Sequence, residues 1–164
     1  MKEKRRQDMS SQTDNLQNAA ILFQQGHLDK AEKILKKLRK RFPASVEVLR
    51  LSGLTAFHRN YSNLAVKFFK KAIRLSPDSY SLLSLLGTAL VENKDFSSAE
   101  AVYQHALSNN PQDPGLYNNL GNLLRETGDF KKAENSYWKS LSFEPNSQMV
   151  LLNLADVLYK MKNF

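Results

Sequence analysis

Apolar and small residues recur along the chain at spacings of three and four, which place side chains on one face of an α-helix. Residues 114–147 contain two such stripes in succession. They are formed first by Tyr117, Leu120, Gly121 and Leu124, and then by Ala133, Tyr137, Ser140 and Leu141. Polar residues occupy the positions between them. The pattern predicts two amphipathic helices packed face to face, with Gly121 and Ala133 small where the helices approach and Tyr137 filling the space beside them.

The same two stripes return every 34 residues, as between Pro111 and Pro145. In each unit a proline follows the second stripe, where it cannot continue a helical hydrogen-bond ladder. The period divides the chain into four units and part of a fifth, namely 12–45, 46–79, 80–113, 114–147 and 148–164. A single helix pair cannot bury both of its apolar faces, whereas stacked pairs can. The sequence therefore predicts an all-α domain over 12–164.

Start and stop signals place the individual helices. Asp95, Asp113, Asp129, Ser45 and Ser147 stand where a side chain can cap a helix N-terminus. No pattern typical of β-strands competes with the helices. The predicted helices span 12–25, 28–41, 46–59, 62–75, 80–93, 96–109, 114–127 and 130–143. The preceding segment, residues 1–11, is predicted to be a flexible basic tail.

The spacing of these residues resembles the tetratricopeptide repeat, whose signature combines W-x2-L-G-x2-Y, A-x3-F and a final proline. The resemblance implies a right-handed α-solenoid of stacked antiparallel helix pairs. It also implies a protein- or peptide-binding scaffold whose ligand lies along the first helices of the units, in a concave groove. On this resemblance the chain is expected not to be an enzyme, and its partner is expected to be a protein or peptide.

The resemblance further implies which side chains face the groove. In the downstream units they are Asn118, Asn119, Asn122, Arg125, Glu126, Asn153, Asp156 and Tyr159. In the upstream units they include Arg50, Phe57, His58, Ser84 and Thr88. Amide side chains both donate and accept hydrogen bonds, so the four asparagines are candidates to hold a peptide backbone, while Arg125 would add charge-assisted bonds.

Trp138 replaces a polar residue of the other units and is predicted to lie on the convex side, either as a partner contact or as cover for a neighbouring side chain.

Residues 148–164 match only the first helix of a unit, with Leu151, Leu154, Ala155 and Leu158 on the period. Further apolar residues are spread around this helix, whereas a terminal cap would show a polar outer face. Two alternatives follow. In the favoured one the sequence is part of a longer protein; in the other, residues 148–164 bury their open face in self-association.

Charge is distributed unevenly along a chain whose net charge is +8. Residues 1–79 contain 17 Lys and Arg against 7 Asp and Glu, whereas residues 80–164 contain 7 against 9. Such asymmetry can mark a surface for nucleic acid or an acidic partner. A solvated helix face is the favoured explanation for the lysines of 28–41. No aromatic residues interleave with them for base stacking, so nucleic acid is the less favoured partner.

Catalytic and metal-binding motifs are not found. The chain has no cysteine, its three histidines lie in different units, and no phosphate-binding loop or nucleophile elbow occurs. No catalytic residue, metal ligand or cofactor is therefore predicted. No apolar run is long enough to span a membrane, so the expected location is cytoplasmic. The alternative from another functional class is that the chain is the recognition arm of a longer enzyme, of the glycosyltransferase or sulfotransferase type, continuing past Phe164.

Overall fold

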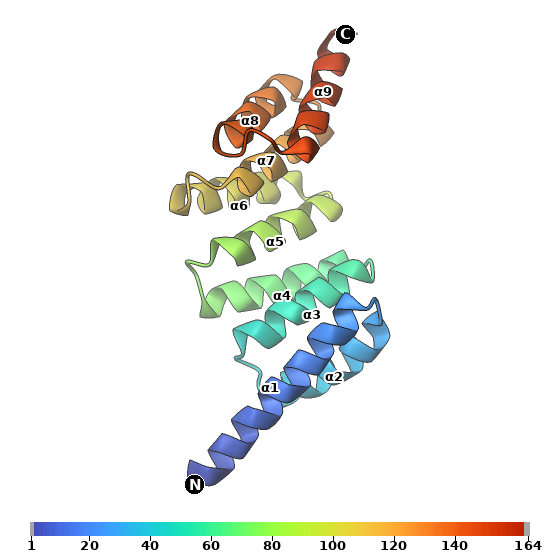
Figure 1. The fold of residues 1–164 in the computed structure, drawn as a ribbon, viewed down its shortest axis with the longest axis vertical. Coiled ribbons are helices and arrows are strands. Elements are labelled where there is room, and N and C mark those ends of the chain that lie inside the picture. Colours follow the sequence, from blue (N-terminus) through green and yellow to red (C-terminus); the bar gives the residue numbers. More distant parts are fainter. Residues whose placement is uncertain (1, 163–164) are drawn as a thin grey trace. The chain divides into compact units, whose positions relative to one another are not determined.

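The computed structural model describes the backbone of residues 2–162 and the side chains of residues 12–162 (Figure 1). The described part is made of α-helices and the turns between them, with no strand. The helices are α1 Lys2–Gln24, α2 Leu28–Arg41, α3 Val46–His58, α4 Ser62–Leu75, α5 Tyr80–Glu92, α6 Phe96–Asn109, α7 Pro114–Glu126, α8 Phe130–Phe143 and α9 Gln148–Lys162. The even-numbered helices occupy the predicted ranges, and the odd-numbered helices from α3 to α7 end one residue early.

Helix α1 differs from the prediction at its start. It begins at Lys2, whereas the sequence predicts a helix from residue 12 and a flexible tail before it. The segment 2–11 contains no proline or glycine and several good helix formers, so nothing in it stops the helix from extending. Its side chains lie outside the described residues, and so does Phe164.

The chain divides into two compact units, Met1–Pro77 and Asp78–Phe164. In the first unit α1 packs on α2, α2 on α3, and α3 on α4. One core joins its first three helices and consists of Ala19, Leu35, Leu38, Val48 and Leu51. In the second unit the same succession of neighbours runs from α5 to α9. A core at its end consists of Leu124, Ala133, Tyr137, Leu141, Val150, Leu154 and Val157. Each unit is thus a stack of antiparallel helix pairs, as predicted.

A glycine and an aromatic ring meet inside three of the helix pairs. The pairs are Gly53 with Phe69, Gly87 with Tyr103, and Gly121 with Tyr137. A Cβ atom at these glycines would lie 2.4, 2.4 and 2.6 Å from the nearest ring carbon, closer than real Cβ contacts allow. The ring therefore lies directly on the backbone of the first helix. This confirms the predicted roles of Gly121 and Tyr137, and Ala133 is fully buried beside them.

Side-chain caps hold five of the helix N-termini, four of them as predicted and the fifth at Ser79, whose hydroxyl accepts from Leu82 N. The backbone N–H groups of Val48, Ser98, Leu116 and Lys132 donate to Ser45, Asp95, Asp113 and Asp129 respectively. At the start of α9 the backbone N–H of Leu151 donates to the carbonyl of Ser147, as the corresponding groups do in α3 to α8, and a side-chain cap at Ser147 stays a prediction. These contacts satisfy backbone donors that have no partner within the helix.

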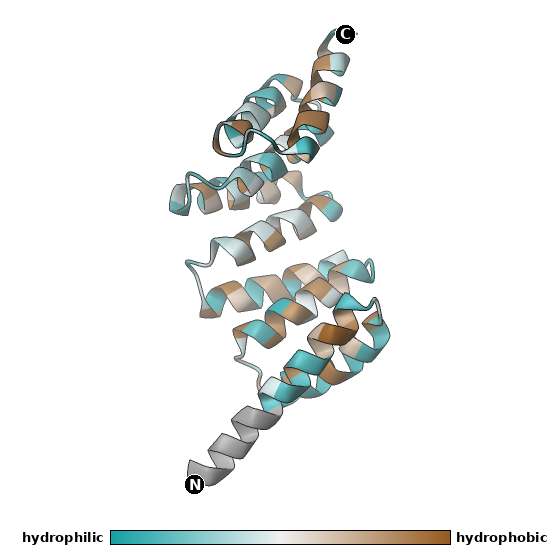
Figure 2. Cartoon of the chain, viewed as in Figure 1, coloured by the Kyte–Doolittle hydropathy of each residue, from teal (hydrophilic) through white to brown (hydrophobic). Residues whose placement is uncertain are grey.

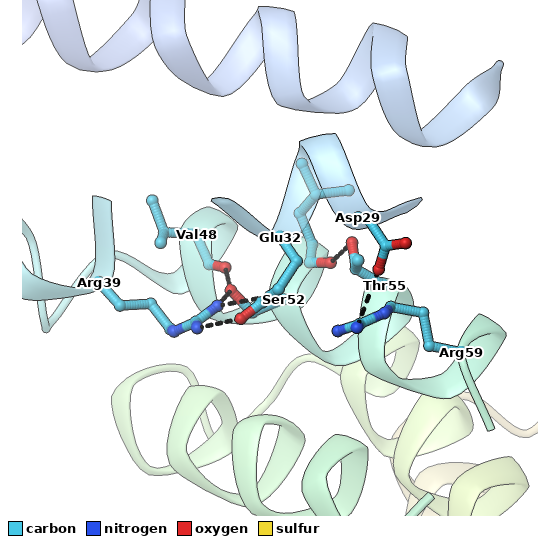
Figure 3. A network of polar contacts seen from close by, with 8 residues as sticks. Asp29, Glu32, Arg39, Val48, Ser52, Thr55 and Arg59 are labelled. Atoms are coloured by element: carbon cyan, nitrogen blue, oxygen red, sulfur yellow. Dashed lines mark hydrogen bonds and ion pairs between the residues drawn. The ribbon is translucent and has the colours of Figure 1, made fainter. Parts of the chain in front are cut away.

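A polar network ties α2 to α3 within the first unit (Figure 3). Arg39 pairs with Glu32 at 2.6 Å and donates to the hydroxyl of Ser52 at 2.9 Å. Ser52 in turn donates to the carbonyl of Val48. The side chains of Arg39 and Glu32 are only 18% and 22% exposed. The network therefore lies in the interface between α2 and α3, where the charges of Arg39 and Glu32 neutralise each other.

Candidate functional site

Three successive first helices of the second unit, α5, α7 and α9, are joined by side-chain hydrogen bonds. The amide nitrogen of Asn119 in α7 donates to the hydroxyl of Ser84 in α5 at 3.2 Å. The amide nitrogen of Asn153 in α9 donates to the amide oxygen of Asn118 in α7 at 3.1 Å. Four of the predicted groove residues thus come together from three helices. The 34-residue repeat brings about these contacts, because each bonded pair is 35 residues apart and so lies one residue from equivalent positions of neighbouring units.

Asn118 differs from the other asparagines in its burial. It is only 4% exposed, and its oxygen accepts the bond from Asn153. Buried polar groups need hydrogen-bond partners, and the two amides satisfy each other here. In the structure Asn118 therefore fixes Asn153 and the spacing between α7 and α9. Asn119 and Asn153 are half-buried.

Asn122 meets the aromatic ring of its own helix pair. The hydroxyl of Tyr137 donates to its amide oxygen at 2.8 Å. In the preceding pair Thr88 and Tyr103 form the equivalent contact, with 3.2 Å between their hydroxyl oxygens. In these two pairs the tyrosine of the second helix thus reaches the face of the first helix and hydrogen-bonds a predicted groove residue.

A charged cluster lies between α7 and α9. One guanidinium nitrogen of Arg125 is 3.4 Å from the amide oxygen of Asn153 and 3.3 Å from a carboxylate oxygen of Asp156. Lys160 lies 3.2 Å from the same carboxylate oxygen. Two cations thus share one carboxylate, which leaves positive charge at this point of the surface. Arg125 is held on one side while its side chain stays 31% exposed.

The pKa of the Tyr137 hydroxyl is shifted by burial and by the nearby charges of Arg125 and Asp156. Burial raises the pKa of Tyr137 to about 12, against an ordinary value of 10.0, and nearby Arg125 partly opposes that rise while Asp156 adds to it. Burial also raises the pKa of Tyr103, and its hydrogen bond to Thr88 opposes the rise. Both hydroxyls are therefore protonated at neutral pH, and the Tyr137 hydroxyl acts as a donor to Asn122.

Glu126 of α7 and Tyr159 of α9 are two further predicted groove residues. Both are exposed, and Tyr159 is 71% exposed. Trp138 is also exposed, at 53%, but it lies on the second helix of its pair, α8. The pKa of Glu134 is lowered, chiefly by a hydrogen bond from Lys131 and to a smaller extent by one from Trp138. Trp138 thus contacts a neighbour on its own helix, and its role as a partner contact stays a prediction.

The remaining predicted groove residues, Arg50, Phe57 and His58, belong to the first unit. Arg50 is half-buried and pairs with Glu47 at 2.8 Å. It also lines an open pocket of ≈ 350 Å³ between α1 and α3. His58 is exposed; its ring lies edge-on to Phe57 and to Phe23 of α1, with centroids 5.8 and 5.0 Å apart. Here the first-helix face is more aromatic and less rich in amides than in the second unit.

Two contributors to this surface were missed by sequence reasoning. Lys160 shares the carboxylate of Asp156, and their i, i+4 spacing in α9 was a signal available in the sequence. The second is the hydroxyl of Tyr137 in α8, which donates to Asn122 in α7. The sequence contains a signal for this contact too, because the residue at the position of Asn122 changes with the aromatic residue of the unit. The unit with Phe69 has Leu54 at the position where the two units with tyrosine have Thr88 and Asn122.

Among the described residues, no three or more His, Asp and Glu side chains form a cluster that could hold a metal ion. Across that same part of the chain, none of the helices has the length and apolar character needed to cross a membrane.

Family models of the tetratricopeptide repeat match the chain over residues 16–80, 80–113 and 102–135. The chain therefore belongs to the tetratricopeptide-repeat family, and its fold is an all-α solenoid of helix pairs. No curated protein matches the sequence.

Solved structures of similar fold cover most of the chain. The crystal structure of MamA protein has a TM-score of 0.80 and 25% identity, covering 93% of this chain and 82% of its own. PilF of Pseudomonas aeruginosa has a TM-score of 0.82 and 22% identity, covering 94% and 70%. A thermophilic tetratricopeptide-repeat protein of Thermus thermophilus has a TM-score of 0.78 and 20% identity, covering 88% and 80%. Similarity at this level of identity shows the fold, and tetratricopeptide-repeat folds generally serve as protein-interaction scaffolds.

Proposed function

We propose that the chain is a non-catalytic scaffold that binds an extended peptide segment of a partner protein on the surface formed by α5, α7 and α9. One observation carries the proposal: side-chain hydrogen bonds join α5 to α7 through Ser84 and Asn119, and join α7 to α9 through Asn118, Asn153, Arg125 and Asp156. Pre-ordered side chains lose little conformational freedom when a ligand binds, which favours affinity.

The hydrogen bonds determine what each amide can still offer. Asn119 uses its nitrogen for Ser84, so its oxygen can accept from a peptide N–H. Asn122 uses its oxygen for Tyr137, so its nitrogen can donate to a peptide carbonyl. The pair thus presents one acceptor and one donor on the same helix, which is what an extended backbone requires. Asn118 would act indirectly, by holding Asn153.

The charged end of the surface would select acidic ligands. Arg125 and Lys160 share the single carboxylate of Asp156, so a ligand carboxylate could take up the remaining positive charge. Guanidinium–carboxylate hydrogen bonds are among the stronger ones in proteins. The expected ligand is therefore an extended peptide with an acidic residue placed over α7 and α9. In the first unit, the pocket beside Arg50 would accept an apolar side chain.

A random 12-residue peptide library displayed on phage, selected on the 164-residue chain, tests the proposal. Binding of an enriched peptide is then measured by fluorescence polarisation. The double variant Asn119→Ala/Asn122→Ala should bind at least about tenfold more weakly, since two hydrogen bonds of roughly 1 kcal/mol each are lost. The matched control Asn109→Ala/Asn135→Ala changes two asparagines of α6 and α8 and should bind as the unchanged chain does. Equal loss in both variants, or no enriched peptide, would contradict the proposal.

Self-association through residues 148–164 is a separate prediction. In α9 the side chains of Met149, Leu152 and Tyr159 are 61%, 72% and 71% exposed. Figure 2 shows the apolar character of much of this helix. Light scattering on the chain with and without residues 148–164 tests it. A dimer that becomes a monomer on removal supports association with a second copy, and a monomer in both cases excludes it. The cytoplasmic location likewise stays a prediction of the sequence.

A further inference from the structure

The second helices of the first unit, α2 and α4, carry cations at the same four positions of the repeat. The pairs, each 34 residues apart, are Lys33 with Lys67, Lys36 with Lys70, Lys37 with Lys71, and Lys40 with Arg74. All eight side chains are exposed. Successive positions are three, one and three residues apart, so the four cations of each helix form one stripe. The buried residues of both helices, such as Leu35 and Phe69, occupy the opposite side. We call these eight side chains the basic ridge.

The carboxylates of α2 pair with arginines outside the basic ridge. Helix α2 contains Asp29 and Glu32, which pair with Arg59 and Arg39 at 2.9 and 2.6 Å (Figure 3). Helix α4 contains no acidic residue at all. Within the described part of the chain, no ion pair joins any side chain of the basic ridge to a carboxylate. Folding of the unit therefore leaves all eight charges to solvent or to a ligand.

Side-chain contacts join α2 and α4, the two helices that carry the basic ridge. The guanidinium of Arg39 in α2 lies 4.7 Å from the centre of the Phe68 ring in α4. The same side chain is bonded to Ser52 of α3, the helix that packs against both. Residues beneath the ridge thus fix α2 and α4 relative to each other within the first unit. On α2 the stems of Lys33, Lys36, Lys37 and Lys40 also frame an open hollow.

The repeat itself does not require these cations. In the second unit the equivalent positions of α6 are Ala101, Gln104, His105 and Ser108, and those of α8 are Asn135, Trp138, Lys139 and Ser142. A single lysine therefore stands where the first unit has eight cations. Residues 1–77 hold 17 Lys and Arg against 6 Asp and Glu, whereas residues 78–164 hold 7 against 10. Both units fold as helix pairs, so helix formation does not explain the ridge.

We propose that the basic ridge binds the phosphate backbone of double-stranded nucleic acid without sequence preference. The first and last of the four cations on each helix are seven residues apart, so at about 1.5 Å per residue the cations follow one another on average roughly every 3.5 Å along the axis. One strand of a DNA duplex carries a phosphate about every 3.4 Å of its axis. Seven of the eight side chains are lysines, which bind phosphate as point charges and read no base.

Other anionic partners fit the ridge less well. Single strands are bound by stacking on aromatic side chains, and none of the eight positions is aromatic. Protein hot spots are enriched in tryptophan, tyrosine and arginine, and the ridge supplies one arginine alone. Stable adsorption to a bilayer draws on apolar side chains that insert, which these eight positions also lack. A regular, accessible phosphate array matches a surface made of lysine charges.

Fluorescence anisotropy with a 30-base-pair duplex of arbitrary sequence tests the proposal on the 164-residue chain. Binding should weaken about a thousandfold or more between about 50 and 200 mM salt, as expected for six to ten phosphate contacts. The variant Lys33→Gln/Lys37→Gln/Lys67→Gln/Lys71→Gln should bind at least about a hundredfold more weakly at low salt. Its slope of log K against log salt should be smaller by about 3.6, since each contact contributes about 0.9.

A charge-matched control separates the ridge from net charge. The variant Lys131→Gln/Lys132→Gln/Lys139→Gln/Lys162→Gln removes four positive charges from the second unit and should retain affinity within about threefold. Circular dichroism should show unchanged helix content in both variants, since all the substituted lysines are exposed. A single strand of the same length should bind more weakly than the duplex. The proposal is overturned by equal loss in the two variants, by absent duplex binding at low salt, or by binding only to vesicles containing phosphatidylserine.

Discussion

The contact between a glycine and an aromatic ring, present in three of the helix pairs, is decided by two residues that change together along the chain. Three units combine glycine with phenylalanine or tyrosine, and the first combines Ala19 with Leu35. A ring needs the space that a Cβ would fill, whereas a leucine leaves room for a methyl group. The residue at the repeat position of Asn122 changes with the ring. Leu54 accompanies Phe69, which has no hydroxyl, and Asn122 accompanies Tyr137, whose hydroxyl donates to it. Packing at this point is therefore a property of the residue pair.

Substitution of Gly53 tests this packing. The Cβ of Gly53→Ala would lie 2.4 Å from the ring of Phe69, which is only 1% exposed and has little room to move. Overpacking of this kind costs typically about 1–3 kcal/mol, which exceeds the roughly 1 kcal/mol that alanine gains in helix propensity. Urea denaturation should show a lower midpoint. The double variant Gly53→Ala/Phe69→Leu copies the first unit, and its destabilisation should be smaller than the sum of the two single effects. Simple additivity would contradict the contact.

Ionisation of Tyr137 supplies a second test at the residue scale. Its pKa of about 12 in the folded chain lies above the ordinary 10.0 of an unfolded one. The unfolded chain therefore loses this proton first, and the resulting stabilisation is complete below pH 10 and declines as pH rises from about 10 to about 12. The absorbance of tyrosinate should show a late-titrating component, of which Tyr137→Phe removes a part. An unchanged titration curve in that variant would show that Tyr137 ionises with the exposed tyrosines.

Helix α9 shows how burial on an element depends on its neighbours. It packs on α8 and contacts α7 through Val150, Leu154 and Val157, all of them buried. Leu151 and Leu158 lie on the stripe that the second helix covers in a complete unit, and here they are 45% and 42% exposed. The apolar pattern predicts the helix, but the arrangement of neighbouring elements determines which side is covered.

Two identical substitutions on α9 distinguish its faces. Leu154→Ala should lower the free energy of unfolding by about 2–5 kcal/mol, because it leaves a cavity in the core of the second unit. Leu152→Ala should change it by no more than about 0.5 kcal/mol, since this side chain is 72% exposed. Chemical denaturation followed by circular dichroism measures both. Comparable effects would mean that Leu152 is covered in solution, for instance by a second copy.

At the scale of the whole molecule, the proposed sites fall into different compact units. The basic ridge belongs to Met1–Pro77, and the amide surface from Ser84 to Asp156 belongs to Asp78–Phe164. The units also differ in the sign of their net charge. The two proposals can therefore be tested apart, and either can fail without the other.

Separate expression of residues 1–77 and 78–164 tests this division. Each fragment contains its own packed core, so both should show helical circular dichroism. The peptide enriched on the whole chain should bind 78–164 within about threefold of its original affinity, and the duplex should bind only 1–77. Peptide binding that requires both fragments would mean that the first-helix faces of both units contribute to one site.

The sequence by itself determined the repeat, the positions of the helices and the family, because a 34-residue period leaves few ways to bury two stripes per unit. It also indicated which side chains share a face, since helix geometry depends only on spacing. The tertiary structure decided how those side chains are used. Asn118 is buried against Asn153, Asn122 accepts from Tyr137, and two cations share Asp156. Such pairings depend on the distance between neighbouring units and on side-chain rotamers, which a one-dimensional pattern does not contain.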